Sequence, residues 1–327
     1  MKHFVSIIMP AFNAESRIEK TIHSLEGQSY KEFEIVIIDD GSKDNTALIC
    51  DSLSKQYSNI SVLHEENAGP GKAREKGVRI AKGDIIAFVD SDDYLSDDAL
   101  DVLVSKMDST GADILQFGYK MIDDNGNILS EHPLQECNFE SGKEAFGYFI
   151  AQKNCTNFLW NKVYKHTLFH SIEWPGIFYS EDYVVLAQLY GKATRALTIE
   201  NPLYYYVQHN ESAVNKPFTV RKLDQITAGE YVVGYTRKNY AEYLPEALFY
   251  LATRSARLAE MAKKSSLENK RDIYHEALAA FKASYSEMRQ VLKQQNRTLE
   301  LDKMTRIFGL SPNLAFLLKY LYKGLSI

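Results

Sequence analysis

Residues 83–95 read GDIIAFVDSDDYL, an apolar run that ends abruptly in acidic side chains. The run at 85–89 is short, bounded by turn residues and rich in apolar side chains, which predicts a buried strand. Three carboxylates follow within residues 90–93 and repel one another beside the apolar core. A divalent cation held by carboxylate oxygens would relieve that repulsion. The stretch therefore predicts a metal site at a strand end or, as the alternative, an N-cap for a helix that begins near Ser96.

The residues before this stretch alternate between strand and helix patterns. Nearly continuous apolar runs are typical of strands that are covered on both faces. Apolar residues at every third or fourth position predict helices between these runs. Such alternation implies crossover connections, and therefore a parallel sheet flanked by helices. The predicted strands are residues 4–9, 33–38 and 60–63, and the helices begin near Glu15, Asp44 and Lys72.

Polar clusters follow three of the four predicted strands. They are PAFN at 10–13, DD at 39–40 and DSDD at 90–93. Ligands of open parallel sheets bind outside the carboxyl ends of the strands. Because the three clusters would meet at one edge of the sheet, we favour a ligand and metal site over the helix cap.

The pattern continues to about residue 220 and then changes. Before that point we expect a hairpin around 123–127, helices at 141–152 and from Glu181, and strands at 113–119, 158–165 and 195–209. Beyond it strand signals disappear, and helical patterns rich in charged residues predict helices at 221–239, 244–263, 267–295 and 312–324. The sequence therefore predicts an α/β domain at 1–220 and an all-helical domain at 221–327.

Charge separates the same two parts of the chain. Residues 1–220 contain 20 basic and 32 acidic residues, a net charge of −12, whereas residues 221–327 contain 18 and 11, a net charge of +7. Such asymmetry suggests that the two parts have different partners. The expected helix at 312–324 is too short to span a bilayer. It is left open whether this helix packs on the domain, contacts another subunit or lies in a membrane interface.

Composition and missing motifs exclude several classes of protein. Three widely spaced cysteines without a CxxC pair argue against a disulfide framework or a zinc site and for a reducing compartment. No apolar run is long enough for a signal peptide or a membrane span. The loop PAFNAES lacks the glycines of a dinucleotide-binding fingerprint, and no GxxxxGK[ST] motif occurs. We expect a cytoplasmic protein without a nucleic-acid partner.

Four segments together resemble family 2 glycosyltransferases, the inverting enzymes of the GT-A fold that act in bacterial surface-glycan synthesis. The segments are VSIIMPAFN, IIDDGSKDNT, ENAGPGKAREKGV and GDIIAFVDSDDYL, in that order. The resemblance is strong over residues 1–100, extends through LWNKVYK, YSEDY and LYYYVQHNES to about residue 212, and is weak beyond. It implies a Rossmann-like, mostly parallel sheet flanked by helices, with the helical region as a C-terminal extension.

The resemblance also assigns residues to nucleotide-sugar binding. The loop after the first strand would cradle the base and ribose, although Phe12 can either line the base or pack the loop. Asp40 would accept a hydrogen bond from the uracil N3–H, because a carboxylate only accepts hydrogen bonds. Arg74 would meet the diphosphate or base, with a surface helix charge as its alternative. The full set is Pro10, Ala11, Phe12, Asn13, Glu15, Asp39, Asp40, Lys72, Arg74, Asp90 and Ser91.

Metal binding and catalysis fall on later residues. The resemblance implies that Asp92 and His209 bind Mn²⁺ or Mg²⁺, whereas the role of Asp93 as an orienting partner is left open. Asp182, with Glu181 beside it, would be the base that deprotonates the acceptor hydroxyl. The alternative is that both complement the dipole of a helix that begins there. Four aromatic side chains can stack on sugars or simply pack locally, namely Trp160, Trp174, Tyr179 and Tyr183.

The implied reaction transfers a hexose or N-acetylhexosamine from a UDP-sugar to a hydroxyl of a glycan, lipid-linked or glycoprotein acceptor, with a β-glycosidic product. The C-terminal helices would contact the inner face of the plasma membrane or form a homo-oligomer. A non-catalytic scaffold of a glycan-assembly complex is the alternative. A scaffold would be expected to lose DSDD or the later Glu181-Asp182 pair, and both are present.

Overall fold

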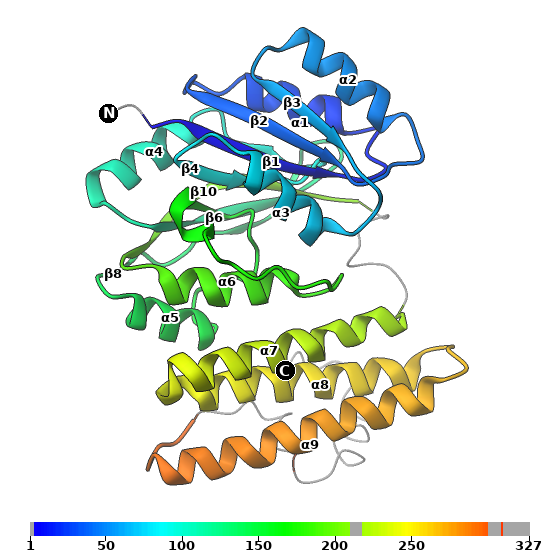
Figure 1. Cartoon of the computed structure of the whole chain (residues 1–327), viewed down its shortest axis with the longest axis vertical. Coiled ribbons are helices and arrows are strands. Elements are labelled where there is room, and N and C mark those ends of the chain that lie inside the picture. Colours follow the sequence, from blue (N-terminus) through cyan, green and yellow to red (C-terminus); the bar gives the residue numbers. More distant parts are fainter. Residues whose placement is uncertain (1–2, 210–217, 300–308, 310–327) are drawn as a thin grey trace. The chain divides into compact units, whose positions relative to one another are not determined.

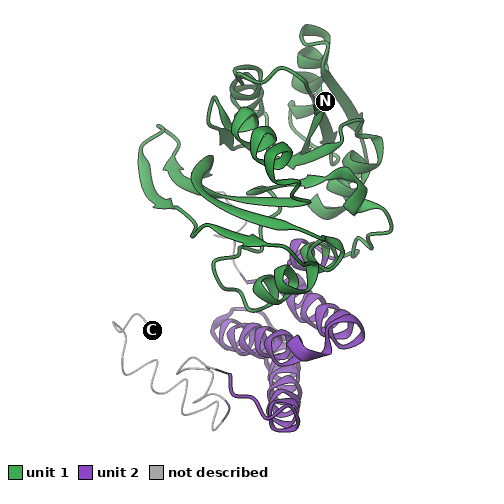
Figure 2. Cartoon of the chain, turned by 90° about the vertical axis from the view of Figure 1, so that its left-hand side faces the viewer, with its two compact units in different colours: residues 1–176, 185–216 green, residues 177–184, 217–327 purple. Residues whose placement is uncertain are grey.

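A computed structural model describes residues 3–209, 218–299 and 309 of the chain. The chain divides into two compact units, which Figure 2 distinguishes by colour. Unit 1 comprises Met1–Gly176 and Val185–Lys216, and unit 2 comprises Ile177–Val184 and Pro217–Ile327. The second unit thus includes a short segment from the middle of the chain.

The described residues of unit 1 form one sheet of ten strands, flanked by helices (Figure 1). Along the sheet the order is β3-β2-β1-β4-β9-β6-β10-β5, while β7 pairs with β6 and β8 with β10. The strands are β1 Val5–Ala11, β2 Phe33–Asp39, β3 Ile60–His64, β4 Ile85–Phe88, β5 Tyr94–Leu95, β6 Ile114–Asp123, β7 Ile128–His132, β8 Cys137–Phe139, β9 Lys162–Lys165 and β10 Ala196–Gln208.

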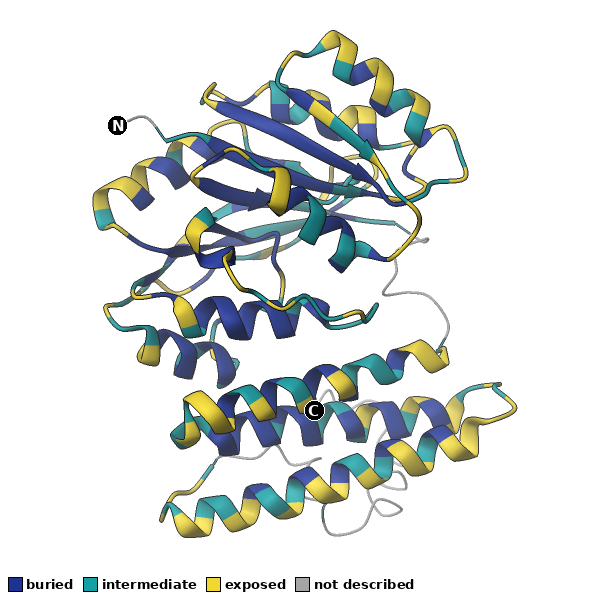
Figure 3. Ribbon diagram, viewed as in Figure 1, coloured by how far each residue is buried: buried dark blue, intermediate teal, exposed yellow. Residues whose placement is uncertain are grey.

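Parallel pairing dominates the longest ladders of this sheet. Strands β3, β2, β1 and β4 are parallel neighbours, as are β6 and β10, whereas β5, β7, β8 and β9 pair antiparallel. Every residue of β2 and β4 is buried, which Figure 3 shows in dark blue. The predicted mixed α/β architecture with a mostly parallel core is confirmed.

Helices connect and cover the strands of unit 1. Helix α3 packs on β1 and β2, where Gly77 allows close approach because a Cβ there would lie 2.4 Å from Cγ2 of Ile8. Helix α6 crosses from unit 2 into unit 1. The helices are α1 Ile18–Glu26, α2 Thr46–Gln56, α3 Pro70–Ile80, α4 Ala99–Thr110, α5 Gly142–Ile150 and α6 Glu181–Lys192, with the 3₁₀ turn η1 His166–Phe169.

The described part of unit 2 is helical. Its elements are η3 Val220–Leu223, α7 Asp224–Asn239, η4 Ala241–Tyr243, α8 Leu244–Lys264 and α9 Lys270–Gln294. The expected helix at 312–324 lies outside the described residues. Among the described helices, none has a stretch apolar and long enough to cross a bilayer.

Two predictions about strands need correction. Residues 158–161 do not continue β9, because they form a turn around the buried ammonium of Lys162. That ammonium donates to the carbonyl oxygens of Thr156 and Phe158, at 2.9 and 2.7 Å. The short strands β5 and β8 went unpredicted, since two or three residues carry no readable periodicity.

Candidate active site

The carboxyl ends of β1, β2 and β4 lie at one edge of the sheet. Ala11 at the end of β1 pairs with Asp39 at the end of β2. The N–H of Val89, just after β4, donates to the carbonyl oxygen of Ile8 at 3.1 Å. The loops that follow these three strands therefore lie at the same edge of the sheet, because the strands are parallel.

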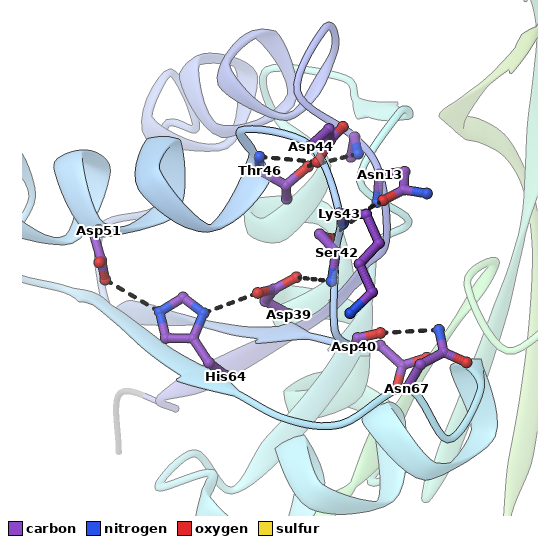
Figure 4. A network of polar contacts seen from close by, with 11 residues as sticks. Asn13, Asp39, Asp40, Ser42, Lys43, Asp44, Thr46, Asp51, His64 and Asn67 are labelled. Carbon is purple, nitrogen blue, oxygen red and sulfur yellow. Dashed lines mark hydrogen bonds and ion pairs between the residues drawn. The ribbon is translucent and has the colours of Figure 1, made fainter.

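Hydrogen bonds join the loop after β1 to the loop after β2 (Figure 4). Asn13 adopts a φ of 51°, its Oδ1 accepts from the N–H of Lys43 at 2.8 Å, and its N–H donates to Oγ of Ser42 at 3.0 Å. Oε2 of Glu15 accepts from the backbone and side-chain amides of Asn45, at 2.9 and 2.8 Å. Asn13 and Glu15 thus shape the loops, and their contact with a nucleotide stays a prediction.

The remaining residues of the first loop differ in exposure. The Phe12 ring is 49% exposed, which favours a role in contacting a ligand over packing of the loop. Ala11 is buried and Pro10 partly buried, and the contact of these two residues with a nucleotide stays a prediction.

Asp39 belongs to a chain of polar groups that fixes the second loop (Figure 4). Its Oδ1 accepts from the N–H of Ser42 at 3.1 Å, and its Oδ2 lies 2.9 Å from Nδ1 of His64. The other ring nitrogen of His64 lies 3.2 Å from Oδ1 of Asp51 on α2. Only an imidazolium donates from both nitrogens. The hydrogen bond that the His64 ring donates to Asp39 raises the pKa of His64, and the hydrogen bond to Asp51 raises it further.

Asp40 bonds to the backbone at the start of α3. Its Oδ1 accepts from the N–H of Ala68 at 2.8 Å and its Oδ2 from the N–H of Gly69 at 2.9 Å. Gly41 follows with a φ of 71°, and a Cβ there would lie 2.8 Å from the nitrogen of Asn67. Each carboxylate oxygen keeps a second lone pair. Recognition of a base by Asp40 therefore stays a prediction.

Arg74 is buried rather than a surface charge. It is 6% exposed, and its Nη2 lies 2.9 Å from Oδ1 of Asp90. The alternative of a solvated helix charge is therefore wrong. Lys72 is more exposed and pairs with Glu75 at 2.7 Å, one turn along α3. Of the two basic residues, Arg74 is the one that joins α3 to residues 90–93, which we call the acidic loop.

Asp93 anchors the acidic loop to β10. It is fully buried, its Oδ2 accepts from the hydroxyl of Tyr204 at 2.7 Å, and its Oδ1 accepts from the N–H of Val207 at 2.8 Å. The Tyr204 hydroxyl also accepts from the N–H of Asp90 at 3.1 Å. Burial raises the pKa of Asp93 well above its ordinary value, and the charges of Asp92 and Asp90 add to this effect. Both oxygens of Asp93 thus serve the shape of the loop.

The acidic loop does not cap the next helix. Helix α4 begins at Ala99 with Asp98 as its N-cap residue, and β5 lies between the loop and the helix. The backbone carbonyl of Ser91 instead accepts from the hydroxyl of Thr21 at 3.1 Å. The helix-cap alternative is therefore wrong.

Asp92 and His209 come together at this edge of the sheet. His209 follows the last residue of β10, and its Nε2 lies 2.7 Å from Oδ2 of Asp92. The two residues are 117 positions apart, so the pairing depends on the ladder between β10 and β5. Burial and the neighbouring charge of Asp90 raise the pKa of Asp92, while His209 opposes the shift.

The carboxylate oxygens of Asp92 and the ring nitrogen of His209 are chemically suited to bind a divalent cation. The carboxylate of Asp92 and the imidazole of His209 are close enough to ligate one ion, and a cation would offset the repulsion between Asp92 and Asp90. Within the described residues no three acidic, histidine or cysteine side chains form a preformed cage. Mg²⁺ is commonly bound by one or two carboxylates together with substrate phosphates. A partial set of protein ligands therefore suits an ion that arrives with a diphosphate.

Glu181 and Asp182 form the first turn of α6 and fall in unit 2. Ser180 before them adopts a φ of 65°, a left-handed conformation that turns the chain into the helix. Glu181 is buried, and Asp182 is partly exposed. Acidic residues in a first turn complement the helix dipole, and this position is equally compatible with a role as a base. The catalytic assignment of both residues stays a prediction.

Two of the four aromatic candidates pack inside the protein. Trp160 is 5% exposed and stacks on Tyr204, with 4.4 Å between ring centroids. Tyr183 is 1% exposed and stacks on Tyr250 at 3.9 Å. For these two residues the packing alternative holds.

Several residues that shape the site were not predicted from the sequence. His64 offered a positional signal, because it ends a strand at the same edge as Asp39. Tyr204 offered no signal in the sequence, because its contact with Asp93 joins residues that are 111 positions apart.

Comparison with known proteins agrees with the fold. The fold is the GT-A type of α/β protein, with C-terminal helices added. The family model described as glycosyl transferase family 2 matches residues 6–180, more than half of the chain. The chain belongs to glycosyl transferase family 2.

Individual relatives are bacterial. EpsH of Bacillus subtilis is 28% identical over 218 residues, which are 65% of this chain and 63% of EpsH. The glycosyltransferase GlyG of Streptococcus pneumoniae is 27% identical over 233 residues, 67% of this chain and 75% of GlyG. The chain thus spans somewhat under two thirds of the length of EpsH and three quarters of that of GlyG.

A solved structure resembles most of the chain. Residues 1–349 of Staphylococcus aureus TarS, in complex with UDP-GlcNAc, match with a TM-score of 0.56 and 21% identity. The match covers 91% of this chain and 94% of that one. At this identity the likeness supports the fold alone.

Proposed function

We propose that this protein transfers a hexose or N-acetylhexosamine from a UDP-sugar to a hydroxyl group of a glycan, lipid-linked or glycoprotein acceptor. The reaction would invert the anomeric centre and form a β-glycosidic bond. The observation that carries the proposal is the meeting of Asp92 and His209, 2.7 Å apart, beside the Arg74–Asp90 ion pair at 2.9 Å. Cation ligands next to a buried guanidinium suit a metal-bound diphosphate.

Donor binding is assigned to the three loops at the sheet edge. Phe12 would contact the base, and Asp40 would accept a hydrogen bond from the uracil N3–H. Asp39, together with Asn13 and Glu15, would hold the loops in position. The TarS structure contains UDP-GlcNAc, which supports a UDP-sugar as the first donor class to test.

The diphosphate end of the donor is assigned to Arg74, Lys72 and the acidic loop. Arg74 would turn part of its guanidinium from Asp90 to the phosphates, and Asp90 and Ser91 would contact the ribose or diphosphate. Asp92 and His209 would hold Mn²⁺ or Mg²⁺. A bound divalent cation supplies charge neutralisation for the departing diphosphate.

Asp182 is proposed as the catalytic base. Its carboxylate would accept the proton of the acceptor hydroxyl as that oxygen attacks the anomeric carbon and the bond to UDP breaks. The proton ends on Asp182, the electron pair of the broken bond ends on UDP, and one displacement inverts the configuration. Glu181 would assist from the adjacent position.

A donor screen tests this proposal. The purified chain is incubated with a panel of UDP-hexoses and UDP-N-acetylhexosamines, with and without Mn²⁺. Water takes the place of the acceptor hydroxyl in this assay, and the UDP released by hydrolysis of the donor is measured. UDP binding is followed separately by calorimetry. We expect Mn²⁺-dependent UDP release from one donor, and its loss in Asp92→Ala. Mn²⁺-dependent binding of UDP without release from any donor would instead favour the non-catalytic scaffold, and neither binding nor release would contradict the proposal.

A further inference from the structure

The segment at 177–184 is held by contacts within unit 2. The backbone N–H of Phe178 donates to Oδ2 of Asp224, the first residue of α7, at 2.8 Å. The guanidinium carbon of Arg221, in η3, lies 4.2 Å from the centroid of the Phe178 ring. The first contact fixes the backbone and the second fixes the side chain of the same residue.

A second anchor lies at the other end of the segment. The ring of Tyr183 stacks on Tyr250 of α8, with 3.9 Å between centroids and 26° between planes. The guanidinium of Arg254 lies over the Tyr250 ring at 5.1 Å. Tyr183 and Tyr250 are 1% and 7% exposed, so the stack is part of the interior of unit 2. Desolvated stacking of this kind restrains ring orientation.

The two anchors bracket the acidic pair. Phe178 lies three positions before Glu181, and Tyr183 directly follows Asp182. Between the anchors, Ser180 holds a φ of 65°, a conformation that non-glycine residues adopt only when the surroundings impose it. The backbone on both sides of Asp182 is therefore set by residues of η3, α7 and α8.

We propose that the C-terminal helices position the catalytic segment, with Asp224, Arg221 and Tyr250 acting as positioning residues for Asp182. The inference rests on the proposed role of Asp182 as the base. It gives the helical unit a function in the reaction itself, independent of any membrane or subunit contact. A base misplaced by about 1 Å can cost on the order of 100-fold in rate.

Pairs of substitutions at the same position test whether the contact itself is required. One substitution of each pair keeps the contact, and the other removes it. Asp224→Asn keeps an oxygen that accepts from Phe178, whereas Asp224→Ala removes it. Tyr250→Phe keeps the stacked ring, whereas Tyr250→Ala removes it. Each variant is assayed for UDP release from the best donor of the screen, for UDP binding in the presence of Mn²⁺, and for amide hydrogen exchange in peptides that span residues 177–184.

We expect Asp224→Ala and Tyr250→Ala to lower kcat at least tenfold, with faster exchange in the 177–184 peptides and a Kd for UDP within twofold of the parent protein. Asp224→Asn and Tyr250→Phe should retain most of kcat. Unchanged kcat in both alanine variants would overturn the proposal. A parallel loss of UDP affinity would also overturn it, because this result indicates general destabilisation.

A double-mutant cycle with Asp182→Asn completes the test. If Asp224 acts through Asp182, then Asp224→Ala should cause no further loss of kcat in the Asp182→Asn background. Additive losses would contradict the inference. If Asp182→Asn itself retains full turnover, the proposed function has failed in its assignment of the base, and this outcome is distinct from failure of the positioning residues.

Discussion

His209 meets Asp92 at the end of the sheet, with 2.7 Å between Nε2 and Oδ2 and 117 positions between the residues. The contact joins the end of β10 to the acidic loop after β4. It places an imidazole nitrogen beside a carboxylate oxygen, the two atoms that we propose as metal ligands. A carboxylate suits either Mn²⁺ or Mg²⁺, whereas imidazole is a ligand of transition metals, so the pair favours Mn²⁺ of these two ions.

Replacing His209 should therefore weaken metal-dependent binding. In His209→Ala we expect the affinity for UDP in the presence of Mn²⁺ to fall about tenfold or more, in line with typical losses around metal sites. Calorimetry with UDP measures the effect, and titration in EDTA should show no difference from the parent protein. His275→Ala, at an exposed position of α9, is the matched control. Equal Mn²⁺ dependence in the parent and His209→Ala would rule out His209 as a ligand.

The hydroxyl of Tyr204 should matter more than that of its neighbour Tyr206. Tyr204→Phe removes the donor to Asp93 and the acceptor for the N–H of Asp90. A buried group left without its partner costs about 1–3 kcal/mol, and we expect a loss of that size in urea unfolding, with weaker Mn²⁺-dependent UDP binding. Tyr206→Phe is the control, since Tyr206 stacks on the same Trp160 ring, at 5.5 Å. Equal stability of the two variants would disprove the anchoring role.

Gly41 should resist substitution because of both its conformation and its surroundings. Its φ is 71°, and an added Cβ would lie 2.8 Å from the nitrogen of Asn67. Left-handed backbone costs a side chain about 1–2 kcal/mol, and the clash adds to this in Gly41→Ala. Gly126→Ala is the control, because Gly126 has a φ of 85° with nothing within 4 Å of an added Cβ. If thermal unfolding shows the same loss of stability in Gly41→Ala and Gly126→Ala, the clash with Asn67 makes no contribution.

Much of the fold was predictable because it depends on local patterns. The runs that became β1, β2 and β4 are short, apolar and bounded by turns, and their parallel pairing follows from the helices between them. The turn at 158–161 resembles a strand in sequence because Phe158, Leu159 and Trp160 are apolar and lead directly into β9. Its conformation depends on the buried Lys162 ammonium, which no periodicity reveals.

The residues of the candidate site also fall into two groups, those that local sequence predicts and those that depend on contacts between distant segments. Asp90, Asp92 and Asp40 are recognisable in the sequence because each follows a predicted strand, at the edge of the sheet where a ligand site is expected. The anchoring of Asp93 by Tyr204, and the pairing of Arg74 with Asp90, depend on contacts between distant segments. The sequence therefore points to the carboxylates as a group, whereas the structure shows that both oxygens of Asp93 hold the loop.

Asp182 should be required for turnover but not for donor binding. Asp182→Asn keeps the size of the side chain and removes its basicity, so we expect UDP release to fall by at least 100-fold, as for loss of a general base. The Kd for UDP should stay within twofold, since the proposed donor contacts lie on other residues. Glu181→Gln tests the neighbour, and its smaller loss would separate the two carboxylates. A variant Asp182→Asn with normal UDP release would require another base.

His64 should make the stability of unit 1 depend on pH. Its pKa is raised above the ordinary value of 6.5, chiefly by the hydrogen bond with Asp39. A raised pKa in the folded state means that the stabilisation is fully present below the unfolded value and is lost as the pH rises through the folded value. The difference in unfolding temperature between the parent protein and His64→Gln should therefore be largest near pH 6 and shrink as the pH rises above 6.5.

The partners of His64 supply the control for this prediction. Asp51→Asn removes the contact at 3.2 Å and leaves that with Asp39 at 2.9 Å, so it should weaken the pH dependence without abolishing it. Asp39 also accepts a hydrogen bond from the N–H of Ser42. The unfolding temperatures over this pH range therefore also test whether the charged imidazole stabilises the loop that is proposed to bind the nucleotide. A stability difference that is the same at pH 6 and pH 9 would show that His64 contributes through its neutral ring alone.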